Sequence, residues 1–236
     1  MVQLKGEYKS SSVSKLFKSI ARRYDLMNTA MTLGRHRYWR KKCVDYMVIE
    51  PGNVLDLASG TGDFVLDLLE ESKAKYVVGL DITPAMLDVA STKISDKKLS
   101  DRVSLLVGDA HKLPFRDGAF EYVTVGFGVR NFQNLPVAID EMRRVLTAKG
   151  RLVVLEIVKP DGWFMSKLFP VFFGIVPPIL GVIFARNKNA YLYLPKSVQE
   201  FMGISELSAT LESNGFPKIR AYRFGCGSVA VIVAEK

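Results

Sequence analysis

The chain of 236 residues has little cysteine, with only Cys43 and Cys226. Two cysteines cannot build a framework of disulfide bridges, and the sequence shows no spacing typical of a metal site, so we expect no metal. Scarce cysteine is typical of a reducing compartment, which predicts a cytoplasmic location. The first dozen residues are polar and lack the apolar core of a secretion signal. Internal repeats and low-complexity tracts are also missing.

The most informative stretch, Asp56–Asp63 (DLASGTGD), follows an apolar run and precedes the helix-like stretch 64–69. This order predicts a buried strand, a glycine turn and a helix. Gly60 and Gly62 permit positive φ angles and let a ligand approach the backbone. The loop lacks the third glycine of a dinucleotide fingerprint and the Gly-Lys-Ser/Thr ending of a phosphate loop. It therefore favours a cofactor without a pyrophosphate, of which S-adenosylmethionine is the common one.

A second predicted strand, 76–81, ends in a carboxylate. Asp81 follows the glycine loop by roughly 20 residues, the place from which an acidic side chain accepts the ribose hydroxyls of a bound nucleoside. Thr83 and Pro84 come next and are typical of an N-cap and a first helical position. We therefore expect a helix to begin at Pro84, directly beside the cofactor.

Three further apolar stretches predict strands at 103–107, 122–125 and 151–156. The first runs into Asp109 and Ala110, where a carboxylate or a backbone amide could meet the edge of an adenine ring. The second opens into Gly126. The third follows Gly150, which we interpret as the glycine that stops the preceding helix.

Acids and glycines therefore follow successive strands in the order in which a cofactor would meet them, which indicates a class I methyltransferase. The predicted fold is α/β, with a Rossmann-like seven-stranded sheet in a single domain over residues 1–236. A helical cap occupies residues 1–50, and an apolar helical insertion occupies 160–200, before the last two strands. A hydrophobic content of 48% is enough for the core of one such domain.

Positive charge is concentrated in the predicted cap. Residues 1–50 contain 11 Lys or Arg against 4 Asp or Glu, so +7 of the net +9 lies there. Apolar residues from Val13 to Tyr24 recur at helical spacing, with lysines and arginines between them. One interpretation is an amphipathic helix pair that covers the cofactor site and exposes its basic side to solvent. The others are contact with an anionic membrane surface or with nucleic acid.

The segment 163–185 is apolar apart from Lys167. Its length would allow a membrane span, but Pro170, Pro177 and Pro178 would break a straight helix. We expect a broken apolar lid on the substrate side of the cofactor, with a buried helix pair as the alternative. An apolar lid beside a basic surface suits a lipid substrate.

The chain resembles the ubiquinone/menaquinone biosynthesis C-methyltransferases of the UbiE type from about Val13 to Phe216. Beside the glycine loop, the stretches most particular to that family are Tyr24-Asp25-Leu26-Met27-Asn28, Gly34-x-His36-Arg37 and Phe127-Gly128-Val129-Arg130-Asn131. The chain departs from the family at Gly126, where a serine is usual, and after Val229, where the histidine of the final strand is missing. The resemblance implies methyl transfer from S-adenosylmethionine to a ring carbon of a prenylated quinol, demethylmenaquinol or a related polyprenyl benzoquinol, in respiratory quinone biosynthesis.

The predicted site combines the glycine loop, the strand ends and the positions that match the family. We expect the cofactor to contact Asp56, Ala58, Ser59, Gly60, Thr61, Gly62, Asp81, Ile82, Met86, Gly108, Asp109, Ala110 and Gly126. The catalytic candidates are Arg130, His36 and Tyr24. An arginine does not readily lose a proton, so we assign Arg130 to stabilising a phenolate or orienting a water. The alternative role for Arg130 is an ion pair that holds the loop after the predicted strand 122–125. The alternative role for His36 and Tyr24 is a structural contact in the cap.

The expected partners are a prenylated quinol lipid and the inner face of the cell membrane, contacted peripherally; a homo-oligomer stays open. We expect no nucleic acid, because the Asn/Asp-Pro-Pro-aromatic arrangement of base methylation is replaced by Gly126-Phe127-Gly128, and neither cysteine is placed for attack on a pyrimidine. A methyltransferase acting on RNA or on another lipid is the alternative function. A scaffold without turnover is a third.

Overall fold

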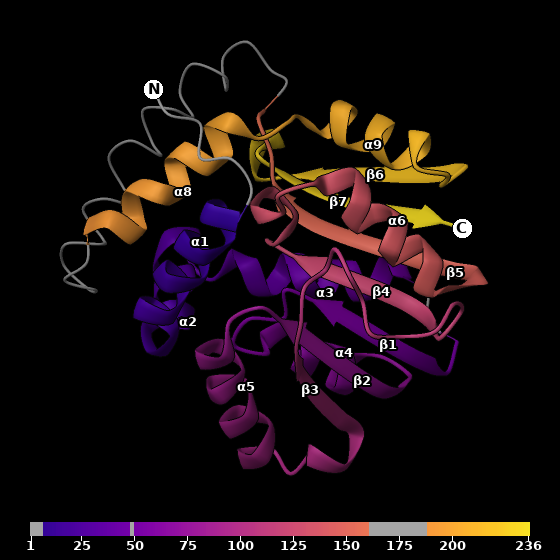
Figure 1. The fold of residues 1–236 in the computed structure, drawn as a ribbon, viewed down its shortest axis with the longest axis horizontal. Coiled ribbons are helices and arrows are strands. Elements are labelled where there is room, and N and C mark those ends of the chain that lie inside the picture. Colours follow the sequence, from indigo (N-terminus) through magenta and orange to yellow (C-terminus); the bar gives the residue numbers. More distant parts are fainter. Residues whose placement is uncertain (1–6, 48–49, 161–187) are drawn as a thin grey trace.

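The computed structural model describes residues 7–47, 50–160 and 188–236 (Figure 1). These residues form one seven-stranded sheet with the strand order β3-β2-β1-β4-β5-β7-β6. The strand bounds are β1 Gly52–Leu57, β2 Ala74–Asp81, β3 Val103–Val107, β4 Phe120–Gly126, β5 Leu146–Ile157, β6 Lys218–Phe224 and β7 Val229–Glu235. The Rossmann-like sheet predicted from the sequence is confirmed.

Strands β1 to β5 are parallel, whereas β7 pairs antiparallel with both β5 and β6. The chain order reverses between β1 and β4, because β2 and β3 lie on one side of β1 and the later strands on the other. In open α/β sheets, ligands bind outside the carboxyl ends of the strands at such a reversal. The topology alone therefore locates the candidate site.

Two layers of helices cover the sheet (Figure 1). Helices α3, α4 and α5 pack on one face, and α6 and α9 pack on the other. Their bounds are α3 Arg35–Met47, α4 Asp63–Glu71, α5 Pro84–Asp96, α6 Leu135–Val145 and α9 Ile204–Ser213. Since both faces are covered, the central strands are apolar on both sides: Val54 packs under α4, while its neighbour Leu55 packs under α6.

Gly150 corrects one sequence-based interpretation. Helix α6 ends at Val145 and β5 begins at the next residue, so Gly150 lies inside the strand and does not stop the helix. A Cβ atom at Gly150 would lie 2.8 Å from the Leu146 side chain and 3.0 Å from the Thr147 carbonyl oxygen. The glycine is therefore required by close packing within the irregular start of β5.

The N-terminal cap consists of α1 Glu7–Ile20, the 3₁₀ turn η1 Ala21–Arg23 and α2 Tyr24–Thr32, followed by α3. In Figure 1, α1 and α2 lie at the left, with α8 Lys188–Glu200 alongside α1. The predicted lid at 163–185 lies outside the described residues. Among the residues that are described, no helix is long and apolar enough to cross a bilayer.

Candidate active site

A pocket with a cavity volume of about 100 Å³, partly open to solvent, lies at the carboxyl ends of β1, β2, β3 and β4. The predicted cofactor residues that line it are Ala58, Gly60, Asp81, Ile82, Met86, Gly108, Asp109, Ala110 and Gly126. These residues, which were predicted from four separate strand ends, surround one cavity.

The two glycines of the loop have different tasks. Both adopt positive φ angles, +55° at Gly60 and +79° at Gly62. A Cβ atom at Gly60 would meet only the Ala58 carbonyl oxygen, at 3.9 Å, so this residue leaves room beside the pocket. At Gly62 a Cβ would lie 2.8 Å from the Cβ of Ala90, so this glycine allows α5 to pack against the loop. Gly60 is the one that admits a ligand.

Asp81 is held in place by the loop. The Gly60 amide donates to its Oδ2 at 2.9 Å, and the Thr83 amide donates to its Oδ1 at 2.8 Å. Burial raises the pKa of this carboxyl group, although both amides favour the charged form. Each carboxylate oxygen keeps further acceptor capacity, and the residue lines the pocket. It is therefore fixed and directed as a ribose-binding acid must be.

Four predicted cofactor residues lie behind the pocket rather than on its surface: Asp56, Ser59, Thr61 and Gly62. Asp56 accepts a 2.6 Å hydrogen bond from Thr124, and burial raises the pKa of Asp56 to about 7. The Ser59 hydroxyl is buried without a partner in the described part of the chain. Thr61 donates to Asp25 of the cap. In this structure these residues shape the loop from beneath.

Gly126, where the resemblance leads one to expect a serine, opens the pocket at the end of β4. A Cβ atom there would lie 3.0 Å from Cδ1 of Phe64 in α4. Any larger residue would require this ring to move. The phenylalanine and the glycine are therefore matched to each other.

His111 is a pocket residue that the sequence analysis missed. Its Nδ1 lies 2.5 Å from Oδ1 of Asp109, and its backbone amide donates to the same oxygen at 2.9 Å. The Asn134 amide donates to Nε2 at 3.1 Å, which makes Nε2 an acceptor and leaves the proton on Nδ1. His111 thus orients Asp109 and is itself held by Asn134, the N-cap residue of α6. Its position two residues after the acid of a strand end was the available signal.

The cap supplies the apolar wall of the pocket. Val13 and Phe17 of α1 and Tyr24 of α2 line it, opposite Phe127 and Phe132. Phe17 and Tyr24 meet edge to face with ring centroids 5.9 Å apart. The N-terminal helices thus cover this pocket, and its use as the cofactor site stays a prediction. An aromatic wall of this kind suits a flat apolar ring.

Arg130 does not line the pocket. It lies in η3 Val129–Asn131, where its guanidinium pairs with the fully buried Glu156 and its Nη1 donates to the Phe127 carbonyl at 2.8 Å. Burial opposes its charge, but Glu156 raises the pKa of Arg130. Its Nε has no partner among the described residues. The ion pair holds the loop after β4, as the alternative interpretation had it, and the catalytic role stays a prediction.

Polar groups between Arg130 and the pocket come from α2, η3 and α8. Burial raises the pKa of the Tyr24 and Tyr193 phenols, and the nearby charge of Arg130 acts against this rise. The Tyr193 hydroxyl donates to Oδ1 of Asn131 at 2.8 Å. Asn131 lines the pocket, and with Oδ1 accepting from Tyr193 its NH₂ group remains a hydrogen-bond donor. Sequence analysis did not single out Asn131 or Tyr193 as site residues.

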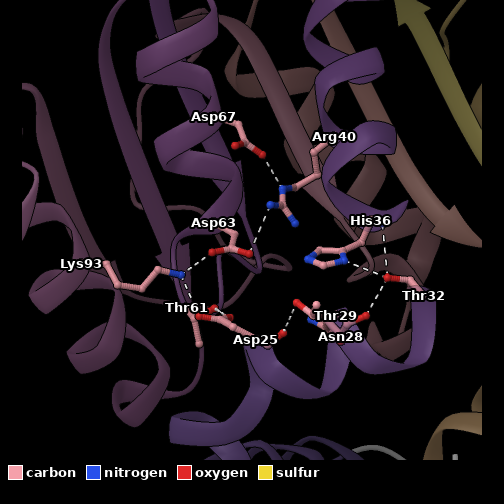
Figure 2. Close-up of polar contacts among 10 residues, drawn as sticks. All are labelled: Asp25, Asn28, Thr29, Thr32, His36, Arg40, Thr61, Asp63, Asp67 and Lys93. Atoms are coloured by element: carbon pink, nitrogen blue, oxygen red, sulfur yellow. Dashed lines mark hydrogen bonds and ion pairs between the residues drawn. The ribbon is translucent and has the colours of Figure 1, made fainter. Parts of the chain in front are cut away.

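His36 of α3 lies beside Thr32 of α2 (Figure 2) and does not line the pocket. It is buried, and its Nδ1 lies 2.8 Å from the Thr32 hydroxyl. Burial and the charge of Arg40 lower the pKa of His36 to about 4, so the ring is neutral at physiological pH. The geometry favours a structural role for His36, while Tyr24 is the catalytic candidate that faces the pocket.

A network of charges ties the cap to the glycine loop (Figure 2). We call it the cap network; its members are Asp25, Arg40, Thr61, Asp63, Asp67 and Lys93. Asp25 of α2 accepts from Thr61 of the loop at 2.5 Å and from Lys93 of α5 at 2.9 Å. Arg40 of α3 joins Asp63 and Asp67 of α4. The cap helix α2 is thereby linked to the glycine loop and to α5.

Comparison with known proteins extends the resemblance to the whole chain. The sequence profile of the ubiE/COQ5 methyltransferase family matches residues 3–236. A demethylmenaquinone methyltransferase of Deinococcus radiodurans is 40% identical over 225 residues, which cover 94% of this chain and 92% of the relative. The protein of the same name from Thermus thermophilus is 40% identical over 222 residues, covering 94% and 100%. A UbiE C-methyltransferase of Geotalea uraniireducens is 34% identical over 230 residues, 97% of each chain.

Solved structures share the fold. A putative S-adenosylmethionine-dependent methyltransferase of Methanococcus maripaludis superposes with a TM-score of 0.68 at 18% identity, covering 100% of this chain and 97% of the other. A methyltransferase of Thermotoga maritima superposes with a TM-score of 0.66 at 17% identity, covering 94% and 99%. At these identities the likeness concerns the architecture alone.

Proposed function

The chain belongs to the ubiE/COQ5 methyltransferase family, and from this premise we propose that it moves a methyl group from S-adenosylmethionine to a ring carbon of a prenylated quinol. Because several relatives are named demethylmenaquinone methyltransferases, demethylmenaquinol is the first substrate to test. The observation that carries the proposal is the pocket, in which two strand-end carboxylates face an aromatic wall built by the cap. The carboxylates would bind a polar nucleoside, and the aromatic wall would bind a flat apolar ring.

The residues present fit S-adenosylmethionine. Asp81 would accept the ribose hydroxyls, and Asp109 with the Ala110 amide would meet the adenine edge, flanked by the apolar side chains of Ile82 and Met86. Gly60 and Gly128 border the cavity on the glycine-loop side without side chains that would fill it. These assignments extend the sequence prediction and add His111 as the residue that orients Asp109.

The bound cofactor would supply an already activated sulfonium methyl group, so the protein must align the acceptor and raise electron density on its ring carbon. Transfer of the proton from the neighbouring ring hydroxyl to a water molecule does this, because the phenolate charge spreads onto that carbon. Asn131 and Tyr24 are pocket residues with polar side chains, and the Tyr24 hydroxyl is hydrogen-bonded to Asn28. Arg130 would stabilise the negative charge through them, from behind the pocket wall.

A prenylated quinol is dissolved in lipid, so the enzyme would work at the inner face of the cell membrane. The six exposed basic side chains of the cap between residues 13 and 40 support a peripheral contact with anionic lipid. RNA is the competing anionic partner. The apolar character of the wall formed by Val13, Phe17 and Phe132 favours a lipid substrate over a nucleic acid.

One assay separates these substrates. Purified protein would be incubated with labelled S-adenosylmethionine and, in parallel, with total membrane lipid or total RNA, and the labelled product would be identified by mass. We expect label in a quinol. Label in RNA, or in a lipid other than a quinol, would replace the proposal. No label in either pool would leave the scaffold interpretation.

Cofactor binding has its own test in Asp81→Ala. Loss of hydrogen bonds to a charged acceptor should weaken S-adenosylmethionine binding by roughly 1.5–3 kcal/mol, measured by calorimetry. Asp88→Ala, which removes an exposed carboxylate of the adjacent helix α5, is the matched control and should bind normally. An unchanged affinity in folded Asp81→Ala would refute the assignment of this pocket.

A further inference from the structure

Helix α2 ends in a leucine with two unfavourable properties. Leu33 has φ 51° and ψ 39°, a left-handed conformation, and 87% of its surface is exposed. Glycine or asparagine usually occupies the left-handed position at a helix end, because a larger side chain crowds the backbone there. Leucine also gains nothing from burial at this exposure. A residue that is both strained and exposed points to a contact outside the chain.

Further apolar surface accompanies Leu33. Leu26 lies two turns earlier on the same side of α2 and is 54% exposed. Tyr38, in the first turns of α3, is 52% exposed and carries an aromatic ring with a polar end, the kind of side chain found at membrane interfaces. Its ring meets that of Phe224 of β6 edge to face, with ring centroids 6.1 Å apart. We call Leu26, Leu33 and Tyr38 the apolar tip. These residues flank the turn between α2 and α3.

Basic side chains surround the apolar tip. Residues 13–40 contain seven Lys or Arg and one Asp, a net charge of +6. Within the cap network Lys93 and Thr61 bind the single acid, Asp25, and Arg40 is engaged by Asp63 and Asp67. The other six basic side chains are exposed: Lys15, Lys18, Arg22, Arg23, Arg35 and Arg37. The surface around the tip is therefore strongly positive.

A polar hollow adds a place for a phosphate group. It lies between η1 and α5 and is lined by Lys18, Arg22 and Arg23, with Asp88 as the one acid. Three positive charges against one negative charge leave the hollow suited to an anionic headgroup. Exposed apolar side chains beside basic ones are what a lipid surface recognises, since the former enter the acyl region and the latter contact phosphates.

We propose that the apolar tip is inserted into an anionic phospholipid bilayer, with Leu33 leading and the six basic side chains on the headgroups. This rests on the proposed function only in that a lipid-dissolved quinol requires the pocket to meet the membrane. Because Phe17 and Tyr24 of the same cap line the pocket, docking through the tip brings the pocket wall to the bilayer.

Leu33→Asn tests the proposal, because asparagine tolerates the left-handed conformation and is polar. The thermal midpoint of the variant should rise, while its partitioning onto sedimented vesicles containing phosphatidylglycerol should fall about tenfold, the effect of losing one inserted leucine. A purely structural leucine would not show these opposite changes. Val137→Asn, at a 40% exposed apolar residue of α6, is the matched control and should partition like wild type.

Charge and oligomerisation complete the test. Arg35→Gln/Arg37→Gln should weaken binding to the same vesicles, and added salt should reduce the difference between this variant and wild type. Equal partitioning of Leu33→Asn and wild type would overturn the proposal. So would a wild-type dimer that Leu33→Asn dissociates in light scattering without changing vesicle binding, since the tip would then contact a second copy.

A third readout separates the tip from the proposed activity. Methyl transfer to a short-chain quinol in detergent should be unchanged in Leu33→Asn, because no bilayer is involved. If wild type binds vesicles in a manner that depends on Leu33 but methylates no quinol, the proposed function fails and the lipid contact stands. If the quinol is methylated but the protein does not bind vesicles, the proposed membrane insertion is refuted and the proposed function stands.

Discussion

Two clusters of ion pairs lie near the pocket, and their side chains differ in solvent exposure. Arg130 and Glu156 form an isolated pair in which the arginine side chain is 5% exposed and the glutamate is fully buried. The cap network spreads over four helices and the glycine loop, and its carboxylates are 26–38% exposed. One cluster is sealed inside the molecule, and the other is shared between protein and solvent.

This difference decides what each cluster can do. In the buried pair either charge without the other would be severely destabilising, so the pair must stay intact and fixes the loop that carries Asn131. In the cap network the contact between Asp25 and Lys93, whose side chains are 38% and 25% exposed, is screened by water and is weaker, whereas Arg40 is buried between Asp63 and Asp67. The first cluster fixes the loop after β4, and the second links the cap to the glycine loop through a contact that water screens.

The largest expected effect comes from breaking the buried pair. Glu156→Ala leaves the Arg130 charge uncompensated and removes the acceptor of the Arg130 and Ile157 amides. We expect a loss of about 3–5 kcal/mol in the free energy of unfolding, measured by urea denaturation. Glu235→Ala, which removes the partly exposed ion pairs of β7 with Arg151, Lys218 and Arg220, is the control and should lose less than about 1 kcal/mol. Equal losses of stability in Glu156→Ala and Glu235→Ala would contradict the proposed difference between buried and exposed ion pairs.

Replacing the whole pair separates stability from chemistry. In Arg130→Met/Glu156→Leu two apolar side chains of similar size fill the space, so stability should return close to that of wild type. Turnover of the quinol should still fall on the order of 100-fold, because the positive charge behind the ring has gone. Binding of S-adenosylmethionine should be unchanged. A stable double variant with normal turnover would reduce Arg130 to a structural residue.

The neutral His36 beside the cap network gives a pH-dependent effect. Burial lowers its pKa from an ordinary value of 6.5 to about 4, so between these values the unfolded chain binds the proton and the folded protein does not. Keeping His36 neutral therefore contributes up to roughly 3 kcal/mol to the free energy of unfolding above pH 6.5. This contribution is lost as the pH falls to 4. The stability difference between wild type and His36→Asn, followed by urea unfolding from pH 7 to 4, should shrink accordingly. A constant difference would contradict the burial of a neutral ring.

The smallest effect is expected in the cap network. Asp25→Asn removes the charge that Lys93 contacts while keeping an oxygen for the Thr61 hydroxyl. Since Asp25 is 38% exposed, the stability loss should be no more than about 1 kcal/mol and should shrink with added salt. S-adenosylmethionine should dissociate faster in stopped-flow measurements, because the cap is released from the loop. A loss as large as that of Glu156→Ala would show that the network is not screened.

The sheet and the cofactor half of the site were predictable because local signals agree there. Strand ends, glycines and acids such as Asp81 are encoded within a few residues of one another, and the parallel topology brings them to one edge. Burial could not be predicted from the same pattern. Asp56 and Thr61 belong to the loop motif, but the strand and the cap turn them away from the cavity.

The substrate half depends on contacts between distant segments. Glu156 holds Arg130 across 26 residues, and Tyr193 reaches Asn131 across 62, so no sequence motif contains either pair. His111 was overlooked because its role depends on the N-cap of α6, which a strand-end pattern does not include. Gly150 was misjudged for a related reason: a glycine near a helix end resembles a stop, whereas its real constraint is the Leu146 side chain.

The position of β7 has a consequence for synthesis of the protein. β7 is made after β6 but lies between β6 and β5. A nascent chain that has emerged only as far as β5 therefore exposes a strand edge that is apolar on both faces, with Leu152 on one and Val153 on the other. Such an edge recruits other strands. The hairpin of β6 and β7 must form and dock as a unit to close it, so this late step is where chaperones and aggregation would compete for the chain.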